Sequence, residues 1–143
     1  MRVGIAAGDP DKAVLLDLEK SHGAHRYACD ASDPAAVELL FRSVARDLGA
    51  PTLVVHNIDG RVPGIFGKSI NEAAPGMVLE TLQISTFNAF LVGQQAAKLM
   101  CENETDSNGA KGTIIFTNAS AALKGFPKSG AFAMAYHAKA LSR

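Results

Sequence analysis

Short apolar runs alternate with longer amphipathic runs along the first half of the chain. Residues 2–7, 26–29 and 51–56 are brief and largely apolar and lie next to Gly, Asp or Pro, which predicts strands. The clearest apolar stripe at helical spacing is Val37, Leu40, Phe41, Val44 and Leu48. Two Asp-Pro pairs predict helix starts, because Asp9 and Asp33 can accept bonds from unpaired N–H groups and proline suits the first helical position.

The second half begins with the longest helical pattern, residues 75–101. It is apolar on more than one side, which is typical of a central helix or of a helix at an interface. A polar loop separates it from Thr113–Thr117, a β-branched run that predicts a fourth strand, and a last helix begins near Phe132. Strands and helices alternate, so we predict one three-layer α/β domain over residues 1–143 with a parallel sheet of about four strands.

The third predicted strand has a continuous apolar run, Leu53-Val54-Val55, rather than an alternating one. A continuous run is typical of a parallel strand that is buried on both faces. We therefore expect these side chains to lie in the interior.

Composition narrows the classes of partner. The 14 basic and 14 acidic residues cancel and form no block, so we expect neither a nucleic acid nor a membrane surface as partner. No stretch resembles a signal peptide or a membrane span, so we expect a cytoplasmic protein. Cys29 and Cys101 are expected to be reduced thiols. The histidines lack metal-ligand spacing and are expected at the surface or at strand ends: His22, His25, His56 and His137.

The stretch 112–139 is where chemistry is expected. The fourth predicted strand leads into Asn118-Ala119-Ser120, and Gly125, Pro127 and Gly130 mark a loop before the last helix. In an open parallel sheet, ligands bind outside the carboxyl ends of the strands. Ser120 therefore lies at the end of the sheet that binds ligands.

This stretch resembles the active-site segment of the short-chain dehydrogenase/reductase family. That family has a Ser at a strand end, a Gly-Pro loop, and Tyr-x-x-x-Lys about a dozen residues later at a helix start. Ser120 matches the serine, with Ala119 as the alternative alignment, and Phe132 and Tyr136 then stand at the Tyr and Lys positions. The resemblance implies a Rossmann-like NAD(P)-dependent oxidoreductase that acts on a carbonyl or alcohol.

The resemblance extends over nearly the whole chain and implies positions near a cofactor. Asp30 and Ala31 follow the second predicted strand and are similar to the segment that approaches the adenine. Asn57 and Gly60 match the first and last residues of the family's Asn-Asn-Ala-Gly beside the ribose. The implied cofactor is NAD or NADP, and Gly8, at the position that selects between them, favours neither.

Three departures from the family imply an impaired or inactive enzyme. Phe132 has no proton to give, and Tyr136 lacks the positive charge that would lower the pKa of a catalytic phenol. Loss of general acid catalysis typically costs about 10²–10⁴-fold in rate. The Gly-x-x-x-Gly-x-Gly fingerprint is missing, and Asp9-Pro10-Asp11 would place acid against a phosphate.

Each implied site residue also has a structural alternative. Asp30 can serve as a turn or capping residue, and Asn57 can satisfy backbone groups at a strand end. Ser120 can be a satisfied hydroxyl at a strand terminus. Tyr136 is either a displaced catalytic phenol or an aromatic residue on a helix face. Ser85, where the family often carries an Asn of its proton relay, completes the set of candidate positions.

The topology suggests a second class of function. The family orders its strands 3-2-1-4-5-6-7, and the four predicted strands correspond to strands 2–5, without the first and the C-terminal ones. Strands 2 and 4 then either pair directly or leave a slot that a partner chain fills. The alternative to an enzyme is a non-enzymatic interaction module, in which helix 75–101 pairs with its own copy or with an intact relative.

Overall fold

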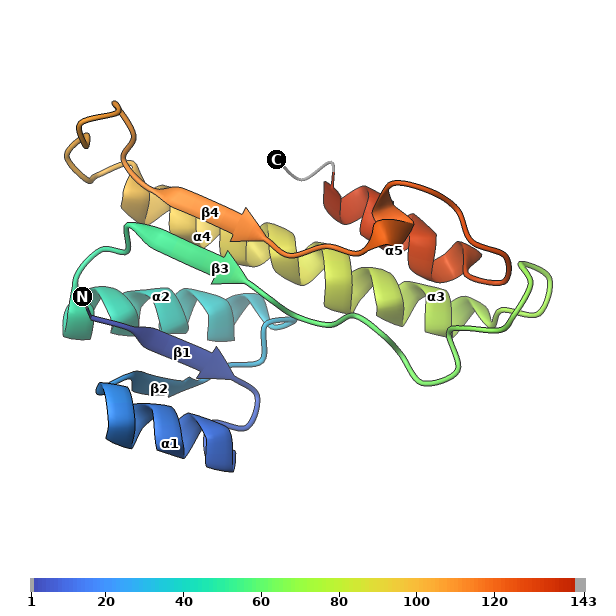
Figure 1. The fold of residues 1–143 in the computed structure, drawn as a ribbon, viewed down its shortest axis with the longest axis horizontal. Coiled ribbons are helices and arrows are strands. Elements are labelled where there is room, and N and C mark those ends of the chain that lie inside the picture. The colour runs from blue at the N-terminus through green and yellow to red at the C-terminus, as the bar shows by residue number, and fades with distance from the viewer. Residues whose placement is uncertain (1, 141–143) are drawn as a thin grey trace. The chain divides into compact units, whose positions relative to one another are not determined.

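The predicted alternation of strands and helices is present in the fold. The computed structural model describes residues 2–140. The elements follow in the order β1 (Gly4–Ala7), α1 (Ala13–His22), β2 (His25–Ala28), α2 (Pro34–Leu48), β3 (Leu53–His56), α3 (Pro75–Leu82), the π-helix η1 (Gln83–Phe87), α4 (Asn88–Met100), β4 (Thr113–Phe116), the 3-10 turn η2 (Ser120–Ala122) and α5 (Gly130–Ala140) (Figure 1). The α/β class predicted from the sequence is confirmed.

The four strands pair as two parallel two-stranded sheets. In one sheet β1 and β2 lie in register from Gly4 opposite His25 to Ala7 opposite Ala28. In the other, β4 pairs with β3: the Thr113 N–H at the start of β4 donates to the Thr52 carbonyl just before β3, and the Thr117 N–H just after β4 donates to the His56 carbonyl at the end of β3. The offset is the same at both ends, as parallel strands require. Within residues 2–140, β1 does not pair with β3, so the strands that correspond to family strands 2 and 4 are not direct neighbours.

The chain divides into two compact units. The first comprises the residues up to Val54 together with Gly93–Ile114, and the second comprises Val55–Val92 together with the residues from Ile115 onward. Strands β1 and β2 and helices α1 and α2 belong to the first unit. Helices α3 and α5, both short helical segments η1 and η2, and the loop after β3 belong to the second unit, which contains the candidate site.

Helix α2 begins as the sequence predicts. The Asp33 carboxylate accepts a hydrogen bond from the Ala35 N–H at 2.9 Å, and Pro34 occupies the first turn. Val37 and Phe41 are buried on the inner face of the helix. Here the capping residue, the proline and the apolar stripe act together, and the helix forms where all three agree.

The same signal at Asp9 predicted a helix start that is wrong. Helix α1 begins at Ala13, and the Asp9 carboxylate instead accepts the Asp11 N–H at 3.0 Å within a turn. The turn is held by Arg26 of β2, whose guanidinium donates to the Pro10 carbonyl and to the Asp11 carboxylate, each at 2.8 Å. A tertiary ion pair therefore overrides the local capping preference.

The long helical pattern of residues 75–101 is confirmed as one helical run, α3–η1–α4, with a π-helical segment in its middle. Ser85 lies in that segment, is fully buried, and donates its hydroxyl to the Thr81 carbonyl. Such π-helical segments often occur at functional sites.

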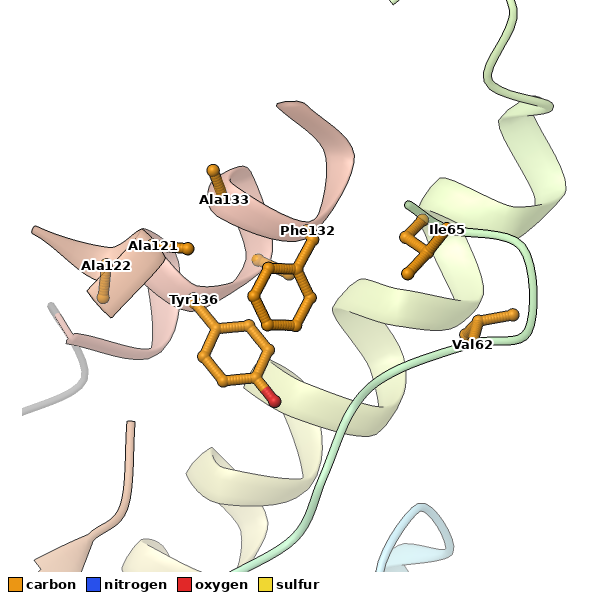
Figure 2. Packing of buried hydrophobic residues seen from close by; sticks show 8 residues of the cluster. Val62, Ile65, Ala121, Ala122, Phe132, Ala133 and Tyr136 are labelled. Atoms are coloured by element: carbon orange, nitrogen blue, oxygen red, sulfur yellow. The ribbon is translucent and has the colours of Figure 1, made fainter. Parts of the chain in front are cut away.

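The core of the second unit lies between the loop after β3, the turn η2 and helix α5 (Figure 2). Its buried members are Val62, Ile65, Ala121, Ala122, Phe132, Ala133, Ala135 and Tyr136. The apolar strand residues are less buried than predicted: Leu53 and Val55 on β3 are 54% and 53% exposed. The prediction of a β3 buried on both faces is wrong for the chain as it stands, because neither side chain lies under a covering layer.

None of the helices in the described part of the chain combines the length and the apolar character that a membrane span needs.

Candidate functional site

Two cavities meet in the second unit and share three wall residues, Phe66, Ala119 and Phe132. We name them the aromatic cavity, of about 450 Å³, and the polar cavity, of about 490 Å³. The aromatic cavity is further lined by Gly67, Ser120, Ala121, Phe126, Pro127, Lys128 and Ser129. The polar cavity is further lined by Asn57, Ile58, Asp59, Arg61, Thr117, Asn118 and Tyr136.

Ser120 is in the wall of the aromatic cavity. It opens the turn η2 shortly after the end of β4, and it is exposed. Its backbone carbonyl accepts hydrogen bonds from the N–H groups of Leu123 and Lys124, at 3.0 and 3.2 Å. The hydroxyl thus stands at the predicted end of the strand, where a ligand in the cavity can accept its hydrogen bond.

Phe132 and Tyr136 lie one turn apart on α5, and both are buried. Their ring centroids are 4.1 Å apart, and Figure 2 shows the two rings next to each other. The Phe132 ring also lies 4.8 Å from the ring of Phe66. The family resemblance implies a proton donor at the position of Phe132. The side chain there is instead an aromatic ring without a polar atom, stacked with neighbouring rings in the wall that the two cavities share.

The Tyr136 hydroxyl is a structural anchor in the polar cavity. It accepts the Gly60 N–H at 3.1 Å and donates to the Asp59 carboxylate at a longer 3.4 Å. Burial raises the pKa of the Tyr136 phenol; the Gly60 amide opposes this and the nearby Asp59 charge adds to it. A phenol with a raised pKa stays neutral near pH 7, whereas a lysine at this position would supply a positive charge.

Asp59 and Arg61 form an ion pair at the polar cavity that the sequence analysis did not single out. The Arg61 Nε donates to both carboxylate oxygens of Asp59, at 2.8 and 2.6 Å. This pairing is the main cause that lowers the pKa of the Asp59 carboxyl. Opposite charges two residues apart in a loop were the only signal in the sequence, and such pairs are common on solvated surfaces.

Gly60 and Asn57 both have structural partners. A Cβ at Gly60 would lie 2.5 Å from the Cβ of Ser85, so only glycine lets this loop approach the π-helical segment. The Asn57 side-chain oxygen accepts the Thr117 hydroxyl at 2.9 Å and so links the ends of β3 and β4. Both groups are therefore engaged within the protein at the positions that the resemblance assigns to a cofactor.

Asp30 and Ala31 belong to the first unit. The Asp30 carboxylate accepts the N–H and the hydroxyl of Ser32, at 2.9 and 2.7 Å, and these bonds lower the pKa of the Asp30 carboxyl. Asp30 is exposed and Ala31 is half-buried. The geometry is that of a turn built by an aspartate before a helix.

A buried polar cluster behind the polar cavity was missed by the sequence analysis. His56 donates from Nε2 to the Asn88 side-chain oxygen at 3.1 Å, in the tautomer that this bond favours, and it is only 3% exposed. Within residues 2–140, neither His56 Nδ1 nor Lys139 Nζ has a hydrogen-bond partner. Burial, with a smaller contribution from the Lys139 charge, lowers the pKa of His56 to about 4, and burial also lowers the pKa of Lys139.

The described residues do not fit a dinucleotide. The 143 residues contain no Gly-x-x-x-Gly-x-Gly loop to hold a diphosphate. The turn after β1, which corresponds to the family's second strand, presents the acidic Asp9 and Asp11, and the Asp11 N–H is already bonded to the Asp9 carboxylate. In the polar cavity, the Gly60 N–H is taken by Tyr136, and no lysine stands at the Tyr136 position. No group of three His, Cys, Asp or Glu side chains suited to a metal ion occurs in the part of the chain that the structure describes.

Comparison with known proteins agrees with the fold. Residues 2–142 match the family model described as Enoyl-(Acyl carrier protein) reductase. The chain is similar to the enoyl-(acyl-carrier-protein) reductase of Anaplasma phagocytophilum in complex with NAD, with 22% identity and a TM-score of 0.79 over 99% of this chain and 52% of that one. No curated protein sequence matches the chain.

Two further solved structures are similar. The sorbitol-6-phosphate 2-dehydrogenase of Erwinia amylovora is 25% identical, with a TM-score of 0.82 over 96% of this chain and 52% of that one. A short-chain dehydrogenase/reductase of Serratia marcescens is 20% identical, with a TM-score of 0.75 over 96% of this chain and 53% of that one. The chain thus spans about half the length of the solved structures that it matches. It belongs to the short-chain dehydrogenase/reductase family, in the group that the enoyl-(acyl carrier protein) reductase model describes.

Proposed function

We propose that this chain is a short-chain dehydrogenase/reductase-type NAD(P)-dependent oxidoreductase of a carbonyl or alcohol substrate, and that its catalytic step is impaired. Membership of the family supports the kind of chemistry, and similar structures were determined with NAD or NADPH. The described residues support the impairment. In the 143 residues, Ser120 keeps a hydroxyl at the cavity, while the groups that would donate a proton and hold a diphosphate are replaced.

The observation that carries the proposal is the Phe132 ring in the wall between the two cavities. Reduction of a carbonyl requires a proton at its oxygen, and this ring has none to give. The Ser120 hydroxyl can orient the oxygen through a hydrogen bond, but an unassisted serine is a poor acid near neutral pH. Binding and orientation of the carbonyl substrate are therefore expected to remain, and proton transfer is the step that is expected to fail.

The test is a titration of the chain with NADH and with NADPH, followed by a turnover assay with acetophenone and NADPH. We expect a dissociation constant for the dinucleotide of about 1 mM or weaker, equivalent to a binding free energy of roughly −4 kcal/mol. The acidic turn after β1 disfavours a phosphate, and the Gly60 N–H, already bonded to Tyr136, is not free to bind a ribose. We also expect turnover close to the rate without protein. Micromolar binding together with clear turnover would contradict the impairment.

The exposed face of the α3–η1–α4 run favours a second candidate function, pairing with another copy of this chain. Leu79, Phe87 and Phe90 are 66%, 42% and 51% exposed along this run. Apolar side chains gathered on one exposed helix are typical of an interface. A module that pairs through this helix would bind a copy of itself or an intact relative without catalysing a reaction.

Sedimentation velocity over a range of concentrations tests this pairing. We expect a dimer that dissociates in the double variant Leu79→Glu/Phe90→Glu, because two charges would be buried in the apolar contact. Leu123→Glu is the matched control, because Leu123 is 85% exposed but lies on the turn after η2. A wild-type chain that stays monomeric at high concentration would exclude pairing through this helix.

A further inference from the structure

We propose that the aromatic cavity binds a planar aromatic ring that carries a carboxylate, with the ring against Phe66, Phe126 and Phe132 and the carboxylate toward Lys128. This inference rests on the proposed function only in taking the Ser120 side of Phe132 as the substrate side. It names the substrate class, which neither the fold nor the family model fixes.

The walls of the cavity select for aromatic rings. Phe66, Phe126 and Phe132 all line the cavity; Phe66 and Phe126 are 49% and 41% exposed, whereas Phe132 is buried. Aromatic pairs prefer offset or tilted contacts at ring-centroid distances of about 4.5–7 Å, and such contacts contribute beyond the area that they bury. The 4.8 Å contact between Phe66 and Phe132 already has this geometry, tilted by 50°. A ligand ring extends the same arrangement, and a saturated ring of equal size does not.

The charge at the cavity selects for an anion. Lys128 is the one charged residue among the described residues that line the aromatic cavity, and none of these is acidic. A second cation stands close by, since Lys124 Nζ lies 5.1 Å from the centroid of the Phe126 ring. The polar cavity differs, because Asp59 neutralises its only arginine. A carboxylate is therefore attracted to the aromatic cavity, whereas in the polar cavity it meets the negatively charged Asp59.

The backbone holds Lys128 in place at a cost. Its φ of 57° lies in the left-handed region, and no other non-glycine residue in the described chain has a positive φ. Its carbonyl accepts the Gly67 N–H at 3.1 Å, which ties the loop of Phe126 to the loop of Phe66. The buried Ser129 hydroxyl donates to the Phe126 carbonyl at 2.7 Å and fixes the same loop. Unfavourable backbone conformations of this kind cluster at ligand clamps.

The volume agrees with a small ligand. About 450 Å³ lies within the range of about 300–1,000 Å³ that is typical of small-molecule sites. An aryl ketone such as 4-acetylbenzoate combines the three features: a planar ring, a carbonyl oxygen for the Ser120 hydroxyl, and a carboxylate for Lys128.

The experiment is isothermal titration of the full chain, without any nicotinamide cofactor, with 4-acetylbenzoate, acetophenone and cyclohexyl methyl ketone. We expect 4-acetylbenzoate to bind most tightly and cyclohexyl methyl ketone most weakly. Phe126→Leu should weaken binding of both aryl ketones by about 2- to 10-fold, the range of an aromatic pair. Tyr27→Leu is the matched control, because it removes an aromatic ring from β2 in the first unit, outside the cavity, and should leave binding unchanged.

Lys128→Asn separates charge from backbone. Asparagine tolerates the left-handed conformation, so the loop is expected to keep its shape while the positive charge is removed. The affinity of this variant for 4-acetylbenzoate should be about 2- to 5-fold weaker, which corresponds to the loss of an exposed ion pair. Its affinity for acetophenone should be unchanged. Far-UV circular dichroism of each variant establishes that it is folded.

The inference is overturned by any of three results in folded proteins: no saturable binding of 4-acetylbenzoate, equal affinity for acetophenone and cyclohexyl methyl ketone, or equal weakening by Tyr27→Leu and Phe126→Leu. An unchanged affinity of Lys128→Asn for 4-acetylbenzoate overturns the carboxylate assignment. Because cofactor is omitted, these results are independent of turnover: failure of the proposed oxidoreductase activity leaves them standing, and loss of aryl ketone binding leaves that activity to its own test.

Discussion

The two cavities on either side of Phe132 differ in what they offer a ligand. The aromatic cavity has three phenylalanine walls, the Ser120 hydroxyl and one lysine. The polar cavity has more hydrogen-bonding groups, but several of them already bond to one another: Asp59 to Arg61, Asn57 to Thr117, and Tyr136 to the Gly60 N–H. A ligand can bond only to groups that are not already bonded within the protein. We therefore expect the aromatic cavity to be the better binding site.

The two sides of Phe132 also differ in what the proposed impairment would remove. The family resemblance implies that substrate and cofactor meet at the position of Phe132 and Tyr136. On the substrate side the replacement of Tyr by Phe keeps the wall and removes the proton. On the cofactor side the replacement of Lys by Tyr keeps a hydrogen bond and removes the charge. The substrate side is expected to bind a substrate without reacting. On the cofactor side, Tyr136 is expected to hold the loop of Gly60 rather than a ribose.

The largest expected effect comes from restoring both groups. In Phe132→Tyr/Tyr136→Lys, the new phenol lies in the wall shared by the cavities and the new ammonium lowers its pKa. At the same substrate and NADPH concentrations for both proteins, we expect turnover to rise by about 10²–10⁴-fold over the wild-type chain. Ultraviolet titration should show a lower phenol pKa in the double variant than in Phe132→Tyr alone, a readout that needs no cofactor. A folded double variant that binds NADPH and shows neither change would contradict the alignment of Phe132 with the family tyrosine.

The buried cluster behind the polar cavity predicts a pH dependence of stability. The folded-state pKa of His56 is about 4, below its ordinary value of 6.5, so the unfolded chain binds more protons between these values. Stability therefore falls as the pH is lowered from about 6.5 to about 4, by roughly 2–3 kcal/mol from this residue. Lys139 and Asn88 are the polar groups that face the ring.

Urea unfolding at a series of pH values measures this effect. In His56→Gln the amide can still bond Asn88 but does not titrate, so the loss of stability in this window should be smaller than in the wild type. His22→Gln, at an exposed position, is the control and should follow the wild-type curve. Parallel curves for wild type and His56→Gln would show that the pKa of His56 is the same in the folded and the unfolded chain, which contradicts the prediction.

A smaller effect tests whether Gly60 serves packing. In Gly60→Ala the new Cβ would meet Ser85 at 2.5 Å, so we expect destabilisation of about 1–3 kcal/mol. Gly76→Ala is the matched control on α3, where a Cβ meets nothing within 4 Å; it should stabilise the chain by about 0.4–1 kcal/mol. Equal midpoints in chemical denaturation for the two variants would show that Gly60 is not required for packing. The position beside a cofactor that the family resemblance implies would then be the remaining interpretation of Gly60.

The smallest effect concerns the anchor in the polar cavity. Tyr136→Phe keeps the ring stack with Phe132 but leaves the Gly60 N–H without its acceptor, which is expected to cost about 1–2 kcal/mol of unfolding free energy. Tyr27→Phe is the control, because the Tyr27 hydroxyl donates to Asp47 at an exposed site, at 3.2 Å. Equal changes in the two variants, measured by urea unfolding, would show that the Tyr136 hydroxyl contributes no more than a surface hydroxyl.

The sequence was most informative where local signals agreed. At Asp33 the cap, the proline and the apolar stripe all favour a helix, and α2 forms there. At Asp9 the cap and proline were present, but Arg26 from the next strand draws Pro10 and Asp11 into a turn. The stripe of residues 75–101 predicted the long helix, but periodicity does not reveal its π-helical segment, in which Ser85 lies close to Gly60 of the loop after β3.

By itself, the sequence determined the order of strands and helices and their parallel α/β class, and it predicts that Phe132 and Tyr136 stand at the family's Tyr and Lys positions. These follow from local periodicity and residue identity, which act over a few residues. Only the tertiary structure decided that Tyr136 bonds Gly60, that His56 and Lys139 are buried, and that three phenylalanines from distant loops and α5 line one cavity. Such juxtapositions join residues far apart in the chain, and their energies depend on burial and distance, which no local pattern encodes.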